Sequence, residues 1–202
     1  MARKEVFKIR GALERGEKVD HSIFKTLLLD PTLSPEDKAS DRLAREGFVI
    51  VAAGGDTTGG TISGLIYHLV ANPAMIQKLR TELSPLFANL QLPSWHQLEQ
   101  IPYMVAVVKE GLRMNHGVSS RLARCAPDRE LRYGDIVIPR GTPVSMSIPD
   151  VHNDPNIFPK PGSFLPERWL RQHSHEDDGE SVSLDKYMVS FCKGTRQCLG
   201  MK

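Results

Sequence analysis

The chain has 202 residues, of which 40% are hydrophobic and 25% are charged. This composition can form a hydrophobic core, and it excludes an intrinsically disordered protein. The formal net charge of +2 is too small to indicate a nucleic acid or a strongly acidic partner. Apolar runs stay shorter than the roughly 18 residues that span a bilayer, and the first residues lack a secretory signal pattern. The sequence therefore leaves the location of the chain open.

The chain contains three cysteines, Cys125, Cys192 and Cys198. An odd number without regular spacing is a poor disulfide framework, and it fits a reducing compartment in which a special cysteine serves chemistry or a metal. Cys192 and Cys198 lack the Cys-x₂-Cys spacing and the nearby histidines of a structural zinc site. A zinc or thiol-based protein built on these two residues is therefore disfavoured.

The first 30 residues indicate short helical pieces, one of them around residues 23–29, which Asp30-Pro31 interrupts. A stronger helix start follows, because Ser34 can cap and Pro35 suits the first turn. No further proline occurs before residue 70. The sequence therefore predicts one long helix over about residues 35–70.

Further helices follow. Asn72-Pro73 ends the long helix and opens another that runs to about Leu83, and residues 94–97 resemble a capping box. A helix over about residues 102–114 carries an apolar face formed by Met104, Val105, Val108 and Leu112.

The hydrophobic period then changes. Residues 121–148 show short alternating runs broken at Gly134-Asp135 and Arg140-Gly141, which are hairpin signals. Residues 149–202 are mostly irregular and include a polar surface loop at residues 172–183.

Four segments carry possible chemistry, and the first is Ala53-Gly-Gly-Asp-Thr-Thr58 within the long helix. Each glycine there costs about 1 kcal/mol relative to alanine. The segment could be a tolerated weak spot, a site of close helix packing, or a phosphate loop, although the lysine of that motif is absent. It could also be a widened turn that faces a small ligand, where Asp56 and Thr57 pass protons.

The other three segments lie in the second half of the chain. Glu110 and Arg113 can pair on one helix face, and taken alone they indicate a surface ion pair. Residues 164–169, Phe-Leu-Pro-Glu-Arg-Trp, indicate only an ordered turn. In the glycine-containing segment from Phe191 to Gly200, Cys198 lies near Arg196, which suits a thiolate ligand stabilised by a positive neighbour.

Together, in this order and at these separations, the four segments resemble the cytochrome P450 superfamily. The oxygen-helix signature Ala/Gly-Gly-x-Asp/Glu-Thr is present at residues 53–57, and the Glu-x-x-Arg motif is Glu110 and Arg113. The Pro-Glu-Arg-type motif lies at residues 166–168. The haem loop Phe-x-x-Gly-x-Arg-x-Cys-x-Gly is matched at every fixed position of residues 191–200.

The resemblance covers about His21 to Lys202, and the segment around residues 117–122 is similar to fungal enzymes of secondary metabolism. It implies a mainly α fold with small β-sheets (α+β). We expect the C-terminal haem-binding portion of that fold, truncated at both ends. Its parts are the long oxygen-binding helix, the Glu-x-x-Arg helix, the hairpin region, and a meander with the haem-binding loop over about residues 149–202.

The resemblance also implies roles for individual residues. Cys198 would be the thiolate ligand of the iron in haem b (iron protoporphyrin IX). Phe191 would shield its sulfur, Gly194 would give the backbone room to turn, and Arg196 would hold a propionate. Arg124, or alternatively Arg121, would contact the second propionate. Thr57 with Asp56 would deliver protons, and a structural charge network would consist of Glu110, Arg113 and Arg168.

The implied activity is monooxygenation: one atom of O₂ enters a small, lipophilic organic substrate, and NADPH supplies electrons through a flavoprotein reductase. The alternative is a non-catalytic remnant that keeps the motifs but lacks the substrate-binding N-terminal half. Full-length members of the superfamily usually reside at the endoplasmic-reticulum membrane.

Overall fold

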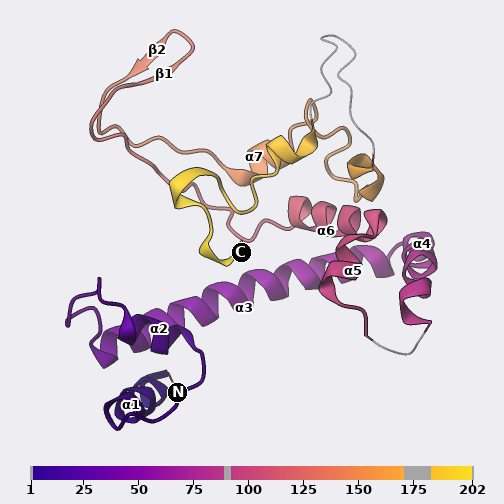
Figure 1. Cartoon of the computed structure of the whole chain (residues 1–202). Coiled ribbons are helices and arrows are strands. Elements are labelled where there is room, and N and C mark those ends of the chain that lie inside the picture. Colours follow the sequence, from indigo (N-terminus) through magenta and orange to yellow (C-terminus); the bar gives the residue numbers. More distant parts are fainter. Residues whose placement is uncertain (1, 89–91, 171–182, 202) are drawn as a thin grey trace. The chain divides into compact units, whose positions relative to one another are not determined.

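The computed structural model describes residues 2–88, 92–170 and 183–201 (Figure 1). Most of the polar loop predicted at residues 172–183 lies outside the described residues. The chain forms two compact units, Met1–Thr57 and Thr58–Lys202, and the long helix α3 (Ser40–Val70) contributes residues to both. The two units are described separately below.

The first unit consists of α1 (Ala2–Glu14), α2 (Ile23–Leu29) and the first half of α3. Its small core contains the buried side chains of Val6 and Ile9 on α1 and Leu43 on α3. Ser22 caps α2, since its hydroxyl accepts a hydrogen bond from the Lys25 N–H at 3.2 Å.

Helix α3 starts at Ser40, five residues after the Pro35 start that the sequence predicts. Ser34 does cap, but it caps only a turn: its hydroxyl accepts from the Asp37 N–H at 3.2 Å and donates to the Asp37 carboxylate at 2.8 Å. This local bonding competes with the continuing helix, as serine and aspartate side chains often do. From Ser40 to Val70 the helix is α-helical throughout, so the widened turn suggested by its glycines is not present.

The second unit begins with the end of α3 and continues with α4 (Pro73–Leu83), η1 (Ser84–Phe87), α5 (Trp95–Glu99) and α6 (Pro102–Met114). The bounds of α4 and α6 agree with the sequence prediction. The capping box is confirmed: the Ser94 hydroxyl accepts from the Gln97 N–H at 3.4 Å, and the Gln97 side chain accepts from the Ser94 N–H at 2.9 Å.

Helix α6 buries a different face from the one that its apolar residues predict. Its buried residues are Tyr103, Ala106, Val107, Glu110, Gly111 and Arg113. Val108, which the prediction placed on the inner face, is 38% exposed. The core of the second unit forms around Tyr103, Val107 and Phe164, and the partly buried side chains packed against it are Leu65, Leu69, Met75, Leu79 and Met114.

The remaining elements are short. Strands β1 (Leu131–Tyr133) and β2 (Ile136–Ile138) pair antiparallel around the predicted Gly134-Asp135 turn, with Arg132 opposite Val137. They are followed by α7 (Ile148–His152), η2 (Pro166–Trp169), η3 (Leu184–Tyr187), η4 (Gly194–Arg196) and η5 (Leu199–Met201). The predicted fold class, mainly α with a small sheet, is thereby confirmed.

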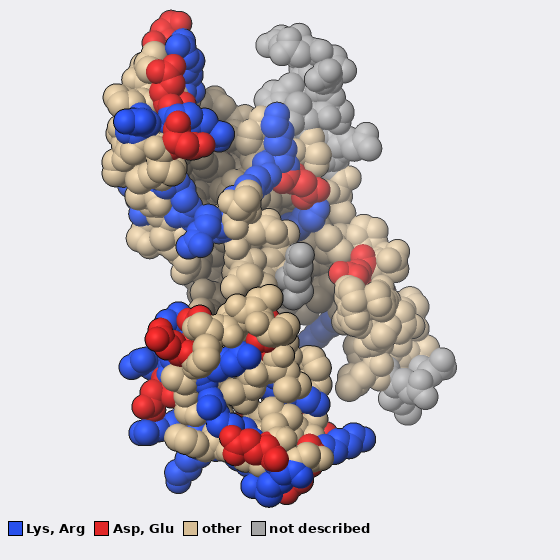
Figure 2. Space-filling model, turned by 60° about the vertical axis from the view of Figure 1, so that its left-hand side comes forward, with Lys and Arg blue, Asp and Glu red and all other residues tan. Residues whose placement is uncertain are grey.

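Figure 2 shows one face of the molecule, on which acidic and basic side chains are interspersed and are separated by wide areas without charged residues. This distribution agrees with a net charge of only +2. None of the helices in the described part of the chain is both long and apolar enough to cross a membrane.

The close approach of α2 to α3 yields a stability prediction. A Cβ atom at Gly47 would lie 2.5 Å from Cζ of Phe24, so the Phe24 ring would have to move. We expect Gly47→Ala to lower the free energy of unfolding by about 1–3 kcal/mol, as overpacking does. The matched control is Gly59→Ala in the same helix, where a Cβ atom meets nothing within 4 Å.

The control should raise the free energy of unfolding by up to about 1 kcal/mol, because alanine favours a helix over glycine. Urea unfolding followed by circular dichroism measures both variants. Equal stability of the two would show that α2 does not pack against Gly47 in solution.

Candidate functional site

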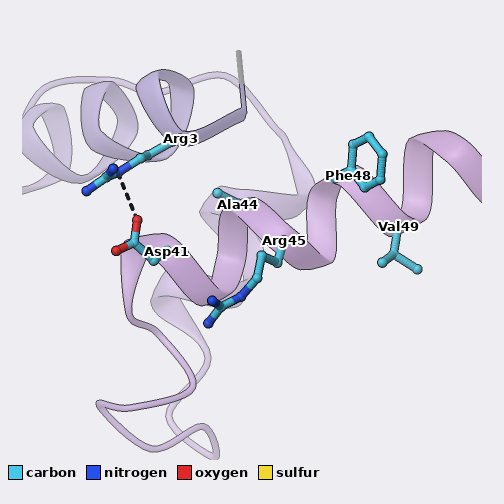
Figure 3. A pocket seen from close by; sticks show the side chains of 6 residues that line it. All are labelled: Arg3, Asp41, Ala44, Arg45, Phe48 and Val49. Atoms are coloured by element: carbon cyan, nitrogen blue, oxygen red, sulfur yellow. Dashed lines mark ion pairs between the residues drawn. The ribbon is translucent and has the colours of Figure 1, made fainter.

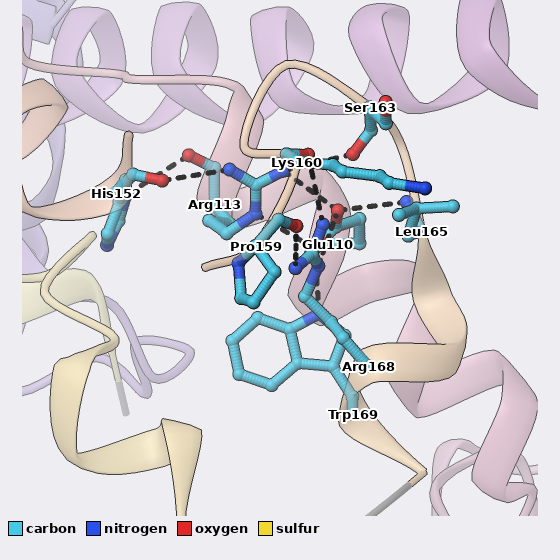
Figure 4. A network of polar contacts seen from close by, with 9 residues as sticks. All are labelled: Glu110, Arg113, His152, Pro159, Lys160, Ser163, Leu165, Arg168 and Trp169. Carbon is cyan, nitrogen blue, oxygen red and sulfur yellow. Dashed lines mark hydrogen bonds and ion pairs between the residues drawn. The ribbon is translucent and has the colours of Figure 1, made fainter. Parts of the chain in front are cut away.

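The carboxylate of Glu110 on α6 lies at the centre of a buried polar network (Figure 4). Arg113, three residues later on the same helix, donates to both carboxylate oxygens: Nε to Oε2 at 2.9 Å and Nη2 to Oε1 at 2.8 Å. Both side chains are 0% exposed. The spacing alone predicts a surface ion pair, and this prediction is wrong. Glu110 and Arg113 pair in the protein interior.

The segment at η2 contributes the second cation. Arg168 donates from Nε to Glu110 Oε1 at 3.2 Å, and the Leu165 backbone N–H donates to the same oxygen at 2.9 Å. The indole N–H of Trp169 donates to Glu110 Oε2 at 2.9 Å. The structure thus brings together the three predicted members of a charge network. It also adds Trp169 and Leu165, which sequence reasoning missed.

Two guanidinium groups face one carboxylate, and each also donates to two backbone carbonyls. Arg113 donates to the carbonyls of His152 at 2.9 Å and Ser163 at 3.3 Å, and Arg168 donates to those of Pro159 at 2.9 Å and Lys160 at 3.4 Å. Burial raises the pKa of Glu110, but the bonds from Arg113 and the Leu165 N–H, together with both guanidinium charges, outweigh burial and hold that pKa below its usual value. Glu110 is therefore ionised at neutral pH.

Glu167 and Arg168 are adjacent but bind different partners. Glu167 forms an ion pair of 3.0 Å with Lys78 on α4, and both side chains are partly exposed. The Lys78 ammonium lies 3.9 Å from the centre of the Tyr103 ring. Burial and the nearby Glu167 charge raise the pKa of Tyr103 to about 12. Glu167 thus ties η2 to α4, while Arg168 ties it to α6.

Both ring nitrogens of the buried His152 are hydrogen-bonded, a role that sequence reasoning missed. Its Nδ1 lies 3.1 Å from the Arg113 carbonyl oxygen, and its Nε2 accepts from the Val189 N–H at 3.1 Å. The available signal was its position at the end of α7, directly before Asn153-Asp154-Pro155, where the helix stops at the C-cap Asn153.

The cysteine loop, which we define as Phe191–Cys198, is closed by a hydrogen bond from the Cys198 N–H to the Phe191 carbonyl at 2.9 Å. Gly194 has φ +79°, a backbone conformation that favours glycine, and it opens the η4 turn that contains Arg196. Phe191 and Cys192 are half-buried, whereas Cys198 is exposed. The loop therefore presents one of its two thiols to the outside.

These residues fit a haem group. The exposed Cys198 thiol could supply one soft ligand, and Leu199 beside it is 98% exposed, which leaves apolar surface next to this residue. A Cβ atom at Gly194 would meet nothing within 4 Å, so the backbone there is open to a flat ligand. Arg196 is exposed in the same loop and can approach a carboxylate.

The other predicted site residues are also exposed. Arg124 donates through Nη1 to the carbonyls of Leu122 at 3.3 Å and Ala123 at 3.0 Å, and its backbone pairs with Val144. Arg121 is exposed as well. Thr57 and Asp56 belong to the first unit, where the Thr57 hydroxyl donates to the Ala53 carbonyl at 2.8 Å.

The first unit has a shallow pocket of its own between α1 and α3 (Figure 3). An ion pair of 2.8 Å between Arg3 and Asp41 closes one side, and Phe48 and Val49 line the other. None of the predicted site residues lies in it.

Comparison with known proteins identifies the family to which these features belong. The family model described as cytochrome P450 matches residues 4–202. This chain belongs to the cytochrome P450 family. The charge network and the cysteine loop described above lie within the part of the chain that matches the P450 model.

The chain is similar to several fungal cytochrome P450 monooxygenases. It is 45% identical over 182 residues to astB of Aspergillus terreus, covering 89% of this chain and 34% of that protein. It is 38% identical over 191 residues to tndB of Aspergillus flavipes, covering 94% of this chain and 38% of the relative. It is 43% identical to pbrB of Penicillium brasilianum over 182 residues, 89% of this chain and 34% of the relative. The chain thus spans about a third of the length of these P450 relatives.

The buried P450 network generates a second prediction. Arg113→Lys keeps the positive charge but cannot reproduce the bidentate bond to Glu110 together with the two carbonyl bonds. We expect it to lower the free energy of unfolding by about 2–4 kcal/mol, because hydrogen bonds to charged groups contribute roughly 1.5–3 kcal/mol each and several of them are lost. The matched control is Arg132→Lys, because Arg132 pairs with Glu130 at 3.0 Å on the surface.

The control should change the free energy of unfolding by less than about 1 kcal/mol. Urea unfolding followed by tryptophan fluorescence measures both variants. A loss below 1 kcal/mol for Arg113→Lys would contradict the structural role of the network.

Proposed function

We propose that this chain carries the haem-binding part of a haem-thiolate monooxygenase, with Cys198 as the ligand of the iron. The observation that carries the proposal is the exposed Cys198 thiol in the closed loop that begins at Phe191. The family membership of the chain supports it. The reaction inserts one atom of O₂ into an organic substrate, and the other atom leaves as water.

The residues of the cysteine loop hold the group and tune it. The Cys198 sulfur binds as a thiolate, and Phe191 limits the access of water to that sulfur. Arg196 pairs with one haem propionate, and Arg124 contacts the second, with Arg121 as the alternative. When bound, the haem supplies the binding and reduction of O₂, and the cysteine thiolate favours O–O cleavage.

Proton delivery is assigned to Thr57 with Asp56. The Thr57 hydroxyl donates to the Ala53 carbonyl, and a hydroxyl can both accept and donate a hydrogen bond, so once it rotates away from that carbonyl it can pass a proton to a ligand. Asp56 is an exposed carboxylate next to it and can exchange protons with water.

The proposed electron source is NADPH, through a cytochrome P450 reductase or a similar flavoprotein. The proposed substrate is a small, lipophilic molecule of secondary metabolism. Relatives from Aspergillus and Penicillium are named cytochrome P450 monooxygenases, which supports a redox partner and a small-molecule substrate in general.

The ligand assignment is tested with the two loop cysteines. Cys198→Ala should abolish the thiolate-type spectrum of the reduced carbon monoxide complex, because no other sulfur replaces the ligand. Cys192→Ala is the matched control and should keep that spectrum, because Cys192 is half-buried. The assignment would be wrong if the two variants behaved in the reverse way.

Proton delivery is tested by Thr57→Ala, with Thr57→Ser as the variant that keeps the hydroxyl. In protein that supports NADPH-dependent turnover, Thr57→Ala should retain haem but release about ten times more hydrogen peroxide per NADPH, within the range of a positioned proton-transfer group. Thr57→Ser should stay close to the parent. Unchanged coupling of NADPH oxidation to product in Thr57→Ala would refute the role.

A second candidate function is a non-catalytic chain that keeps the motifs but does not hold haem. It is favoured by the large apolar side chains exposed on α3 in the first unit, such as Phe48 at 71% and Val51 at 74%. Haem titration separates the two candidates: one haem per chain with a thiolate-type spectrum supports the monooxygenase, and no specific binding supports the non-catalytic chain.

A further inference from the structure

The two residues that precede the cysteine loop are both tied to other elements. The Val189 N–H donates to His152 Nε2 at 3.1 Å, and the Ser190 hydroxyl donates to the Leu112 carbonyl on α6 at 3.0 Å. The next residue, Phe191, accepts the hydrogen bond from Cys198 that closes the loop. The position of the thiol therefore depends on what holds Val189 and Ser190.

The hydrogen-bond pattern fixes the protonation of His152. Its Nε2 faces an N–H donor and must therefore carry the lone pair, so the proton lies on Nδ1 and is donated to the Arg113 carbonyl. In return, Arg113 donates from Nη1 to the His152 carbonyl at 2.9 Å. A doubly protonated ring would direct a second N–H against that of Val189. The tie to the loop thus exists only with a neutral imidazole.

The surroundings of His152 keep the ring neutral. Its side chain is fully buried, the His116 ring lies 5.7 Å away and the Phe158 ring packs edge-on at 6.1 Å. Burial, followed by the His116 and Arg113 charges, lowers the pKa of His152 to about 4, although the Arg113 carbonyl and the Glu110 carboxylate act in the opposite direction. The ring is therefore neutral at physiological pH.

We propose that His152 is a positioning residue that couples the buried Glu110–Arg113 network to the cysteine loop through the backbone of Val189. Its two ring nitrogens join the last turn of α6 to Val189, 37 residues after His152, so the side chain cross-links the two segments. The inference rests on the proposed function only in taking Cys198 as the haem ligand. The coupling itself is a property of the polypeptide.

Two neutral substitutions separate the bonds of His152. In His152→Gln, the side-chain oxygen can accept from the Val189 N–H in place of Nε2. In His152→Asn, the shorter side chain can donate to the Arg113 carbonyl in place of Nδ1 but does not reach Val189. Amide hydrogen exchange of the haem-free 202-residue chain is measured at Val189 and Cys198, with Val107 in the core of α6 as the reference.

We expect His152→Asn to accelerate exchange at Val189 and Cys198 about tenfold relative to Val107, which is the order expected for one lost hydrogen bond. In His152→Gln all three amides should stay within about threefold of the parent. Parent-like exchange in both variants would overturn the proposal. Equal acceleration at all three amides would also overturn it, because His152 would then be a general core residue.

The parent chain provides a test that needs no substitution. The folded state binds a proton at His152 only near pH 4, whereas an opened state binds it near the ordinary value of 6.5. Protection at Val189 is therefore complete above pH 6.5 and falls as the pH decreases towards 4, by about thirtyfold at pH 5 after correction for intrinsic rates. Unchanged protection at Val189 between pH 7 and pH 5, after correction for intrinsic rates, would overturn the proposal. A failure of the haem assignment would appear only in the Cys198→Ala spectrum, so the two claims can fail independently.

Discussion

The interaction on which the second unit depends is the buried carboxylate of Glu110, which accepts hydrogen bonds from two guanidinium groups, an indole and a backbone N–H. Transfer of such charges from water costs several kcal/mol per ion, so the network is stable only because every bond of the set is made together. Its donors come from α6 and from residues 165–169, and its outer acceptors are carbonyls between residues 152 and 163. The irregular stretch of residues 153–165 is thereby held in one conformation although it forms neither a helix nor a strand.

The hydrogen bonds around Glu110 also matter for the haem-binding function that we propose for this chain. A metal ligand in a loop needs a fixed backbone, and no residue of the cysteine loop is itself buried. The segment before it is tied to the last turn of α6 and to His152, whose ring contacts the backbone of Arg113. Hydrogen bonds from His152 and from α6 thus hold the segment that precedes an exposed thiol, which resembles the way outer-shell partners orient the ligands of a metal.

Local signals in the sequence were sufficient for several elements. The bounds of α6 and the Ser94 capping box follow from residues within one turn of each other, and so does the start of α4 at Pro73. Other predictions failed because local or nonlocal hydrogen bonds competed with the predicted structure. The hydrogen bonds between Ser34 and Asp37 form a separate turn, so α3 does not begin at Pro35 as predicted. The inner face of α6 was misplaced because a count of apolar residues treats Glu110 and Arg113 as outward, although their partners lie far along the chain.

The motifs themselves were visible, but their geometry was not. Glu167 and Arg168 are adjacent in sequence, yet they bind Lys78 on α4 and Glu110 on α6 respectively, and no local rule distinguishes the two. The role of His152 was likewise hidden, because it depends on two backbone groups 39 and 37 residues away.

A double-mutant cycle on Glu110 and Arg168 tests most directly whether the network acts as one unit. Glu110→Gln, Arg168→Gln and the double variant are compared with the parent chain by the free energy of urea unfolding. The account predicts a favourable coupling energy of about 1–3 kcal/mol, the range found for residues that share one buried network. Additivity of the two single losses within about 0.5 kcal/mol would contradict it.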